Sequence, residues 1–118
     1  MINDADGLVI TGVDTSTGLK RLGGKRERYE ALLRKFAGSK LGTVIAVRDA
    51  LEAGDLSAAE REVHSLKGAA AALGAVALSE AASDVEAALK AGTCVDETLQ
   101  SLASALDAIV KAIHTRLP

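Results

Sequence analysis

His64, Lys67 and Gly68 have the residue types and the spacing that suit the transfer of a phosphoryl group. A neutral imidazole is a good nucleophile, and its ordinary pKa of about 6.5 leaves much of it neutral near pH 7. On a helix, Lys67 and Gly68 lie one turn beyond His64 and on the same side. The ammonium group of Lys67 can balance a dianionic group near the ring, and Gly68 leaves room for another protein to approach. The spacing therefore predicts an exposed phosphoryl acceptor.

Gly68 is the residue that separates this pattern from an ordinary surface histidine. A glycine inside a helix costs about 1 kcal/mol relative to alanine, and the surrounding stretch otherwise uses alanine freely. The core-facing residues Val63, Leu66 and Ala70 lie about 100 to 160° around the helix from His64, which places the ring outside the core. An exposed histidine alone is most often incidental, so the hypothesis depends on the lysine and the glycine beside it.

The composition indicates that helices position these residues. The chain has 118 residues, 48% of them hydrophobic and 25% charged, with a single proline at position 118. It contains 23 alanines and 16 leucines, and no segment alternates in the manner of a strand. This length and composition predict one all-α domain over 14–118, preceded by a flexible lead over 1–13.

Apolar residues recur with helical spacing through most of the chain. The spacing predicts a short helix capped by Asp14, a helix over 25–37, a run over 41–51 after Gly38-Ser39, and longer helices over 56–73, 78–89 and 95–116. The connections are short, so consecutive helices are expected to be antiparallel neighbours. The predicted fold is an antiparallel up-down-up-down four-helix bundle with one or two accessory N-terminal helices.

Two local details of these helices are also predicted. In the run over 41–51, Leu41 and Ile45 are expected on the same face as its other apolar residues. The next helix can be capped by Asp55 or by Ser57, and the latter has the capping-box spacing to Glu60. The core face of this helix is expected to begin at Leu56 and to continue through Val63, Leu66 and Ala70, which point away from His64. The last helix is expected to pack through five residues, which are Leu99, Leu102, Leu106, Ile109 and Ile113.

The composition excludes several classes of function. Aromatic residues make up 2% of the chain and the net charge is −2, which argues against a nucleic-acid binder. A single cysteine, Cys94, and two histidines fifty positions apart provide no disulfide and no metal site. No apolar run reaches the length of a membrane span. We expect a cytoplasmic protein without membrane contact, either free or cut from a larger membrane-anchored protein.

Around His64 the sequence resembles the histidine-containing phosphotransfer (HPt) family, the relay modules of multistep two-component signalling. The central motif is His64-Ser65-Leu66-Lys67-Gly68. The resemblance extends from about residue 12 to residue 92, and the lead is similar to HPt modules fused to bacterial hybrid sensor kinases. Further matching residues are Gly18-Leu19, Tyr29, Leu32-Leu33, Phe36, Gly54-Asp55, Leu73-Gly74-Ala75, Leu78, Ala82, Glu86 and Leu89.

The resemblance implies a relay function. A receiver-domain aspartyl phosphate would donate to Nε2 of His64, and the phosphohistidine would pass the group to an aspartate of a response regulator. Lys67 would act in phosphate electrostatics and Gly68 in steric access. The module would be a carrier rather than an enzyme, would bind no cofactor or metal, and would use Mg²⁺ held by the partner receiver domain. It is expected to be a monomer. Many relatives have asparagine where this chain has Ala72.

Four more residues are candidates for the site. Glu60 and Arg61 are interpreted as part of a partner-docking rim, with a helix-surface ion pair as the equal alternative. Ala71 would leave room for the loops of a receiver domain. Glu86 is a possible orienter of the imidazole, although a solvated helix charge is the more common role of such a residue.

Other functions remain open at the level of sequence. The phosphoacceptor domain of a histidine kinase also has an exposed histidine, but an acidic residue usually follows it, and here Ser65 does. The phosphoacceptor domain of a chemotaxis kinase is a closer relative, which the lead over 18–36 argues against. A helical adaptor that binds partners without carrying phosphate is the third alternative.

Overall fold

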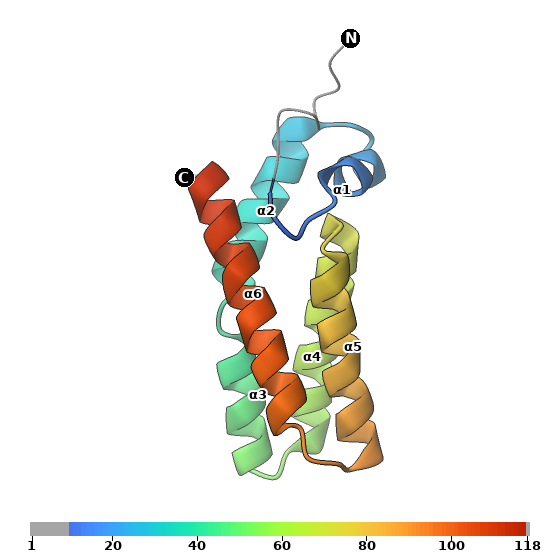
Figure 1. Ribbon diagram of the computed structural model, residues 1–118, viewed down its shortest axis with the longest axis vertical. Helices are drawn as coiled ribbons and strands as arrows, with labels where there is room; N and C mark the ends of the chain where they lie inside the picture. Colours follow the sequence, from blue (N-terminus) through green and yellow to red (C-terminus); the bar gives the residue numbers. More distant parts are fainter. Residues whose placement is uncertain (1–9, 118) are drawn as a thin grey trace.

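The computed structural model describes residues 10–117, which are folded into six helices without a strand (Figure 1). This part of the chain confirms the all-α prediction. The helices are α1 (Thr15–Arg21), α2 (Arg26–Lys40), α3 (Thr43–Glu52), α4 (Leu56–Leu73), α5 (Val76–Ala91) and α6 (Asp96–Arg116).

The long helices form a four-column bundle. Figure 1 shows α2 and α3 following one another in the same direction, so together they make one broken column. The chain then reverses into α4, again into α5, and again into α6, which returns beside α2 and α3. The short α1 lies across one end as the accessory N-terminal helix. The arrangement is therefore the antiparallel bundle that the short connections predicted.

Small residues allow α4 and α5 to pack closely. These two helices share the most extensive contact in the bundle, and Ala59, Ala70 and Ala82 are completely buried. Helices meet at shorter distances when the residues between them are small. On α6, all five residues of the predicted seam are buried, as expected for a narrow apolar stripe. A rigid α4–α5 pair results, and this pair carries the candidate site.

Hydrogen bonds attach both α2 and the start of α1 to the C-terminal end of α4. Tyr29 on α2 donates a hydrogen bond to the carbonyl oxygen of Leu73 at 2.6 Å. The backbone N–H of Asp14, just before α1, donates a hydrogen bond to the carbonyl oxygen of Gly74 at 2.7 Å. Burial, helped by the charge of Asp14, raises the pKa of Tyr29 to about 12. Gly74 ends α4 with a φ of 88°, which favours glycine. This end of the bundle is closed.

The break between α2 and α3 lies later than the sequence predicted. The helix continues through Gly38-Ser39 to Lys40, and the turn falls on residues 41 and 42. A helix that restarts at Thr43 has a different phase, so its buried face is formed by Thr43, Val44 and Val47. Leu41 and Ile45, expected on the core face, are 53% and 65% exposed. That expectation was wrong.

Asp55, one of the two predicted caps, starts α4. Its Oδ1 accepts a hydrogen bond from the backbone N–H of Ala58 at 3.0 Å, so the capping box from Ser57 to Glu60 is not the observed cap. Leu56 is 46% exposed rather than part of the seam. The reason is its position at the first residue of α4, one turn before the helix is covered at Ala59.

The boundary between a flexible lead over 1–13 and the domain falls in part outside the described residues, which begin at residue 10. Within them, Ile10 is 2% exposed and belongs to the core, and Val13 packs against it. Across residues 10–117, no helix is both long enough and apolar enough to span a membrane.

Candidate functional site

The core face of α4 fixes the direction of His64. Val63, Leu66 and Ala70 are completely buried, and a helix turns about 100° per residue, so His64 must point away from the core. Its side chain is 75% exposed. The exposure predicted from the sequence is therefore present, and it follows from the neighbours rather than from the histidine itself.

Glu86 on α5 joins His64 and Lys67 through one carboxylate. Its Oε2 lies 3.0 Å from Nδ1 of His64, and its Oε1 accepts a hydrogen bond from Nζ of Lys67 at 3.1 Å. The Glu86 side chain is only 12% exposed, whereas that of Lys67 is 36% exposed. The contact between Glu86 and the imidazole of His64 is thus present, although from the sequence a solvated charge was the more common role expected of Glu86.

This contact determines which imidazole nitrogen is free to react. An ionised carboxylate only accepts hydrogen bonds, so Nδ1 of His64 must be the nitrogen that carries the proton. In the neutral ring the other nitrogen, Nε2, then keeps its lone pair. The pairing across α4 and α5 therefore leaves Nε2 as the nitrogen with a free lone pair, on a side chain that is largely exposed.

Glu86 stays ionised because two partners favour its charged form. The hydrogen bond from Lys67 lowers the pKa of the Glu86 carboxyl most, and the hydrogen bond with His64 lowers it further. Burial raises that pKa and is the smaller effect, while the charge of Lys90 lowers it slightly. The negative charge facing the imidazole is therefore retained near pH 7.

Gly68 lies one turn beyond His64 and is open to solvent. A Cβ atom built at this position would meet nothing within 4 Å. Its φ is not positive, so the backbone has the ordinary helical form that any residue adopts. Among residues 10–117, nothing therefore requires glycine at position 68, and alanine there would favour the helix. This observation agrees with a requirement that comes from a partner.

The remaining predicted residues lie around the same face. Glu60 and Arg61 line a shallow hollow together with His64, so they are in place to form a rim. Ala71 is exposed, and its carbonyl oxygen accepts a hydrogen bond from the Arg21 side chain. Their roles in docking stay predictions.

Two features of the site were not found from the sequence. Lys90 lines the hollow beside His64 and Glu86, and the i,i+4 spacing from Glu86 was the signal that could have found it. Ser65 accepts a hydrogen bond from Nζ of Lys40 at 2.8 Å. That second contact joins residues 25 positions apart, and no local pattern reveals it.

The second histidine of the chain and its cysteine lie elsewhere. Cys94 is exposed in the turn between α5 and α6, and His114 is exposed in the last turn of α6. Within residues 10–117, no three His, Cys, Asp or Glu side chains are grouped so that they could hold a metal ion.

The family model of the Hpt domain matches residues 31–115 of the chain. Among solved structures, the chain is similar to the HPT domain from the Hpt sensor hybrid histidine kinase of Shewanella. The TM-score is 0.75 at 20% sequence identity, and the match covers 88% of this chain and 92% of that chain. At this identity the likeness concerns the fold. No curated protein matches the chain.

Proposed function

Because the chain belongs to the Hpt domain family, whose members carry phosphoryl groups in the phosphorelays of two-component signalling, we propose that His64 is its phosphoacceptor. The observation that supports this most is the geometry of the ring. Glu86 is paired with Nδ1 at 3.0 Å, and the side chain is 75% exposed. Nε2 is thus the unprotonated nitrogen of an accessible imidazole.

The proposed reaction is a direct transfer between side chains. The lone pair on Nε2 attacks the phosphorus of an aspartyl phosphate in a receiver domain, and a P–N bond forms. The P–O bond to the aspartate breaks, and its electron pair leaves on the carboxylate. The ring gains positive charge while its Nδ1–H faces Glu86, which stabilises that charge. In the second step an aspartate of a response regulator takes the phosphoryl group and restores the neutral ring.

Lys67 supports the phosphorylated state in this proposal. Its ammonium group is held by Glu86 at 3.1 Å, one turn from the ring and partly exposed. A short shift of this flexible side chain lets it also contact a phosphoryl oxygen on Nε2, where the opposite charges attract. Gly68 leaves the approach to Nε2 open for the receiver domain.

The partner brings the remaining chemistry. We propose that Mg²⁺ and the additional carboxylates belong to the receiver domain, and that this module acts as a monomeric carrier in the cytoplasm, alone or joined to an inner-membrane sensor kinase. A stable dimer in solution, measured by size-exclusion chromatography with light scattering, would instead favour the phosphoacceptor domain of a histidine kinase.

Transfer from receiver domains labelled with ³²P tests the assignment. The wild-type protein is expected to gain an acid-labile, base-stable label, and His64→Gln is expected to gain none while its helical circular dichroism is unchanged. His114→Gln, at the other histidine, is the matched control and should be labelled like the wild type. Label retained in His64→Gln contradicts the proposal, and a protein that binds receivers but never gains label is an adaptor.

A further inference from the structure

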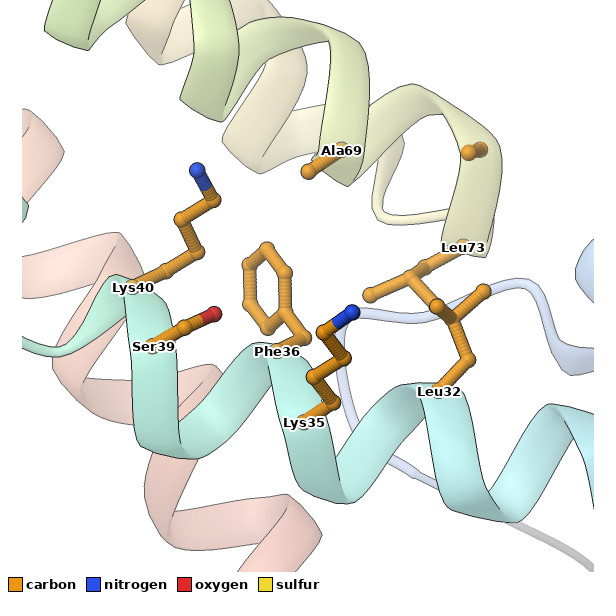
Figure 2. Close-up of a pocket in the computed structure, with 8 residues that line it drawn as sticks. Leu32, Lys35, Phe36, Ser39, Lys40, Ala69 and Leu73 are labelled. Carbon is orange, nitrogen blue, oxygen red and sulfur yellow. The ribbon is translucent and has the colours of Figure 1, made fainter.

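An apolar pocket lies between α2 and α4 (Figure 2). Its volume is about 170 Å³, and its apolar walls are formed by Leu32, Phe36, Ala69, Ala72 and Leu73. Figure 2 shows Phe36 pointing from α2 toward α4. A cavity of about 150 Å³ holds a benzene ring, so the α2–α4 pocket has room for one large apolar side chain.

Two lysines stand at the mouth of the α2–α4 pocket. Lys35 and Lys40 both line it, and Figure 2 shows them on either side of the Phe36 ring. Neither forms a salt bridge with a carboxylate of residues 10–117. An apolar floor with ammonium groups at its rim that have no carboxylate partner within residues 10–117 suits an apolar group that has carboxylates beside it.

The charge of the whole region agrees with such an occupant. Eight of the fourteen Lys and Arg residues fall within residues 20–40, which contain only two of the sixteen Asp and Glu residues. This segment therefore carries a net charge of +6, and the rest of the chain −8. A surface this uneven attracts acidic partners over distances of about 10 Å or more and orients them before contact.

The α2–α4 pocket lies beside the candidate site on α4, and a hydrogen bond joins the two. Lys40 at its mouth donates to the hydroxyl of Ser65, the residue that follows His64. Ala72 in its wall lies eight residues beyond His64, or roughly 12 Å along the helix. Between His64 and Ala72, the exposed residues of α4 are the small residues Ser65, Gly68 and Ala71. A protein that covers His64 therefore also reaches the pocket.

We propose that the α2–α4 pocket receives an apolar side chain of the receiver domain that exchanges phosphate with His64, and that carboxylates on the same receiver segment pair with Lys35 and Lys40. The inference rests on the proposed function and adds a specificity site to it. Ala72 is the residue that keeps the pocket open, because a larger side chain at this exposed position would occupy the space. The pocket thereby selects among receiver domains by the residue that each one presents.

Filling the pocket tests the apolar part of the proposal. The receiver domain that transfers fastest to the wild-type protein is chosen, and its Kd and single-turnover rate are measured with Ala72→Phe. The expected result is a Kd raised about tenfold or more, equivalent to ~1.4 kcal/mol, with a rate at saturating receiver within about twofold of the wild type. Ala108→Phe, the same change at an exposed alanine of α6, is the control and should leave both values unchanged.

Reversing the rim charges tests the polar part independently. The double variant Lys35→Glu/Lys40→Glu is expected to raise Kd about tenfold at low salt and to flatten its salt dependence. The control with the same charge change, Lys111→Glu/Arg116→Glu on α6, should change Kd less than threefold. Rim and control variants with equal Kd values would overturn the pairing of Lys35 and Lys40 with the receiver.

The outcomes separate this inference from the proposed function. If Ala72→Phe binds and transfers like Ala108→Phe while His64→Gln takes no label, the pocket proposal is wrong and the relay stands. If no receiver domain labels the wild-type protein, the relay itself fails. Octanoate serves as a probe for a free apolar acid: micromolar binding that Ala72→Phe abolishes, without any change in the Kd for the receiver, assigns the pocket to a small molecule and overturns the proposal.

Discussion

Gly68 lies within α4, and Gly74 lies six positions later at the C-terminal cap of the same helix. The two glycines differ in the space around them. A Cβ atom at Gly68 would meet nothing within 4 Å, whereas one at Gly74 would collide with the carbonyl oxygen of Asp14. Gly74 also has a φ of 88°, while Gly68 has ordinary helical geometry. A third glycine, Gly18 on α1, has no room either, because its Cβ would overlap Tyr29 and the Leu73 carbonyl.

The difference shows how to distinguish two reasons for a glycine. At the closed end of the bundle, the fold itself requires Gly74 and Gly18, because α1 packs directly on the end of α4. On the open face, the fold leaves room for a side chain at position 68, so we propose that the glycine there serves a molecule that approaches His64. Substitutions at the two places should therefore change different properties.

The largest effect is expected at the closed end. Gly74→Ala places a Cβ in a left-handed conformation and against Asp14, and it should lower the free energy of unfolding by about 3 kcal/mol. Gly68→Ala, the same change on the open face, should raise that free energy by up to ~1 kcal/mol. Urea unfolding followed by circular dichroism measures both. Equal effects at the two positions would remove the distinction between them.

On the open face, function rather than stability should change. Gly68→Gln crowds the approach to Nε2 and should slow phosphotransfer by about tenfold or more, while the helix becomes slightly more stable. Gly38→Gln on α2 is a matched control, since its Cβ also meets nothing within 4 Å. The measurement is the transfer rate from a phosphorylated receiver domain. Rates that fall equally in both variants, or in neither, contradict the assigned role of Gly68.

A smaller effect on stability is expected from the buried hydroxyl of Tyr29. Tyr29→Phe removes the hydrogen bond to the Leu73 carbonyl and should cost about 1 kcal/mol of unfolding free energy without changing transfer. Because folding raises the pKa of Tyr29 to about 12, the wild-type advantage should be complete below pH 10. It should disappear as pH rises toward 12. An advantage that persists at pH 12 would exclude this account of the buried hydroxyl.

The smallest expected effect concerns the positioning role of Glu86. Glu86→Gln keeps an acceptor for Nδ1 but removes the charge, so transfer should slow by about threefold. The lowered pKa of Glu86 means that its contribution to stability is present above its ordinary pKa of 4.5 and is lost as pH falls below it. The unfolding free energies of the two proteins should therefore converge in acid. A constant difference between them from pH 7 to pH 3 would show that the charge of Glu86 is not what stabilises the site.

The sequence alone predicted the parts of the molecule that depend on local spacing. The helices, the exposure of His64 and the positions of Lys67 and Gly68 beside it all follow from residues within two turns of each other. The contact of Glu86 with His64 could be named but not favoured, because it depends on how α5 lies against α4, 22 residues later. The turn after Lys40 was misplaced because Gly38 is tolerated inside α2, and this error reversed the predicted burial of Ile45.

The α2–α4 pocket could not be predicted either, because it depends on how two helices that are distant in the sequence lie against each other. Phe36 and Ala72 come from helices that meet only in the folded bundle, and apolar residues at helical spacing do not show whether the space between two helices is filled. Ala72 stood out in the sequence only as a departure from related proteins. In the structure it is the residue whose small size keeps a wall of the pocket open.

The central claim is that Glu86 holds Nδ1 of His64 so that Nε2 carries the phosphoryl group. ¹⁵N and ³¹P NMR of protein phosphorylated by a receiver domain tests this directly, because the couplings identify the nitrogen that is bonded to phosphorus. The expected result is a single phosphohistidine at His64 with phosphorus on Nε2 and a proton on Nδ1. Phosphorus on Nδ1, or on His114 or any other residue, would contradict the account.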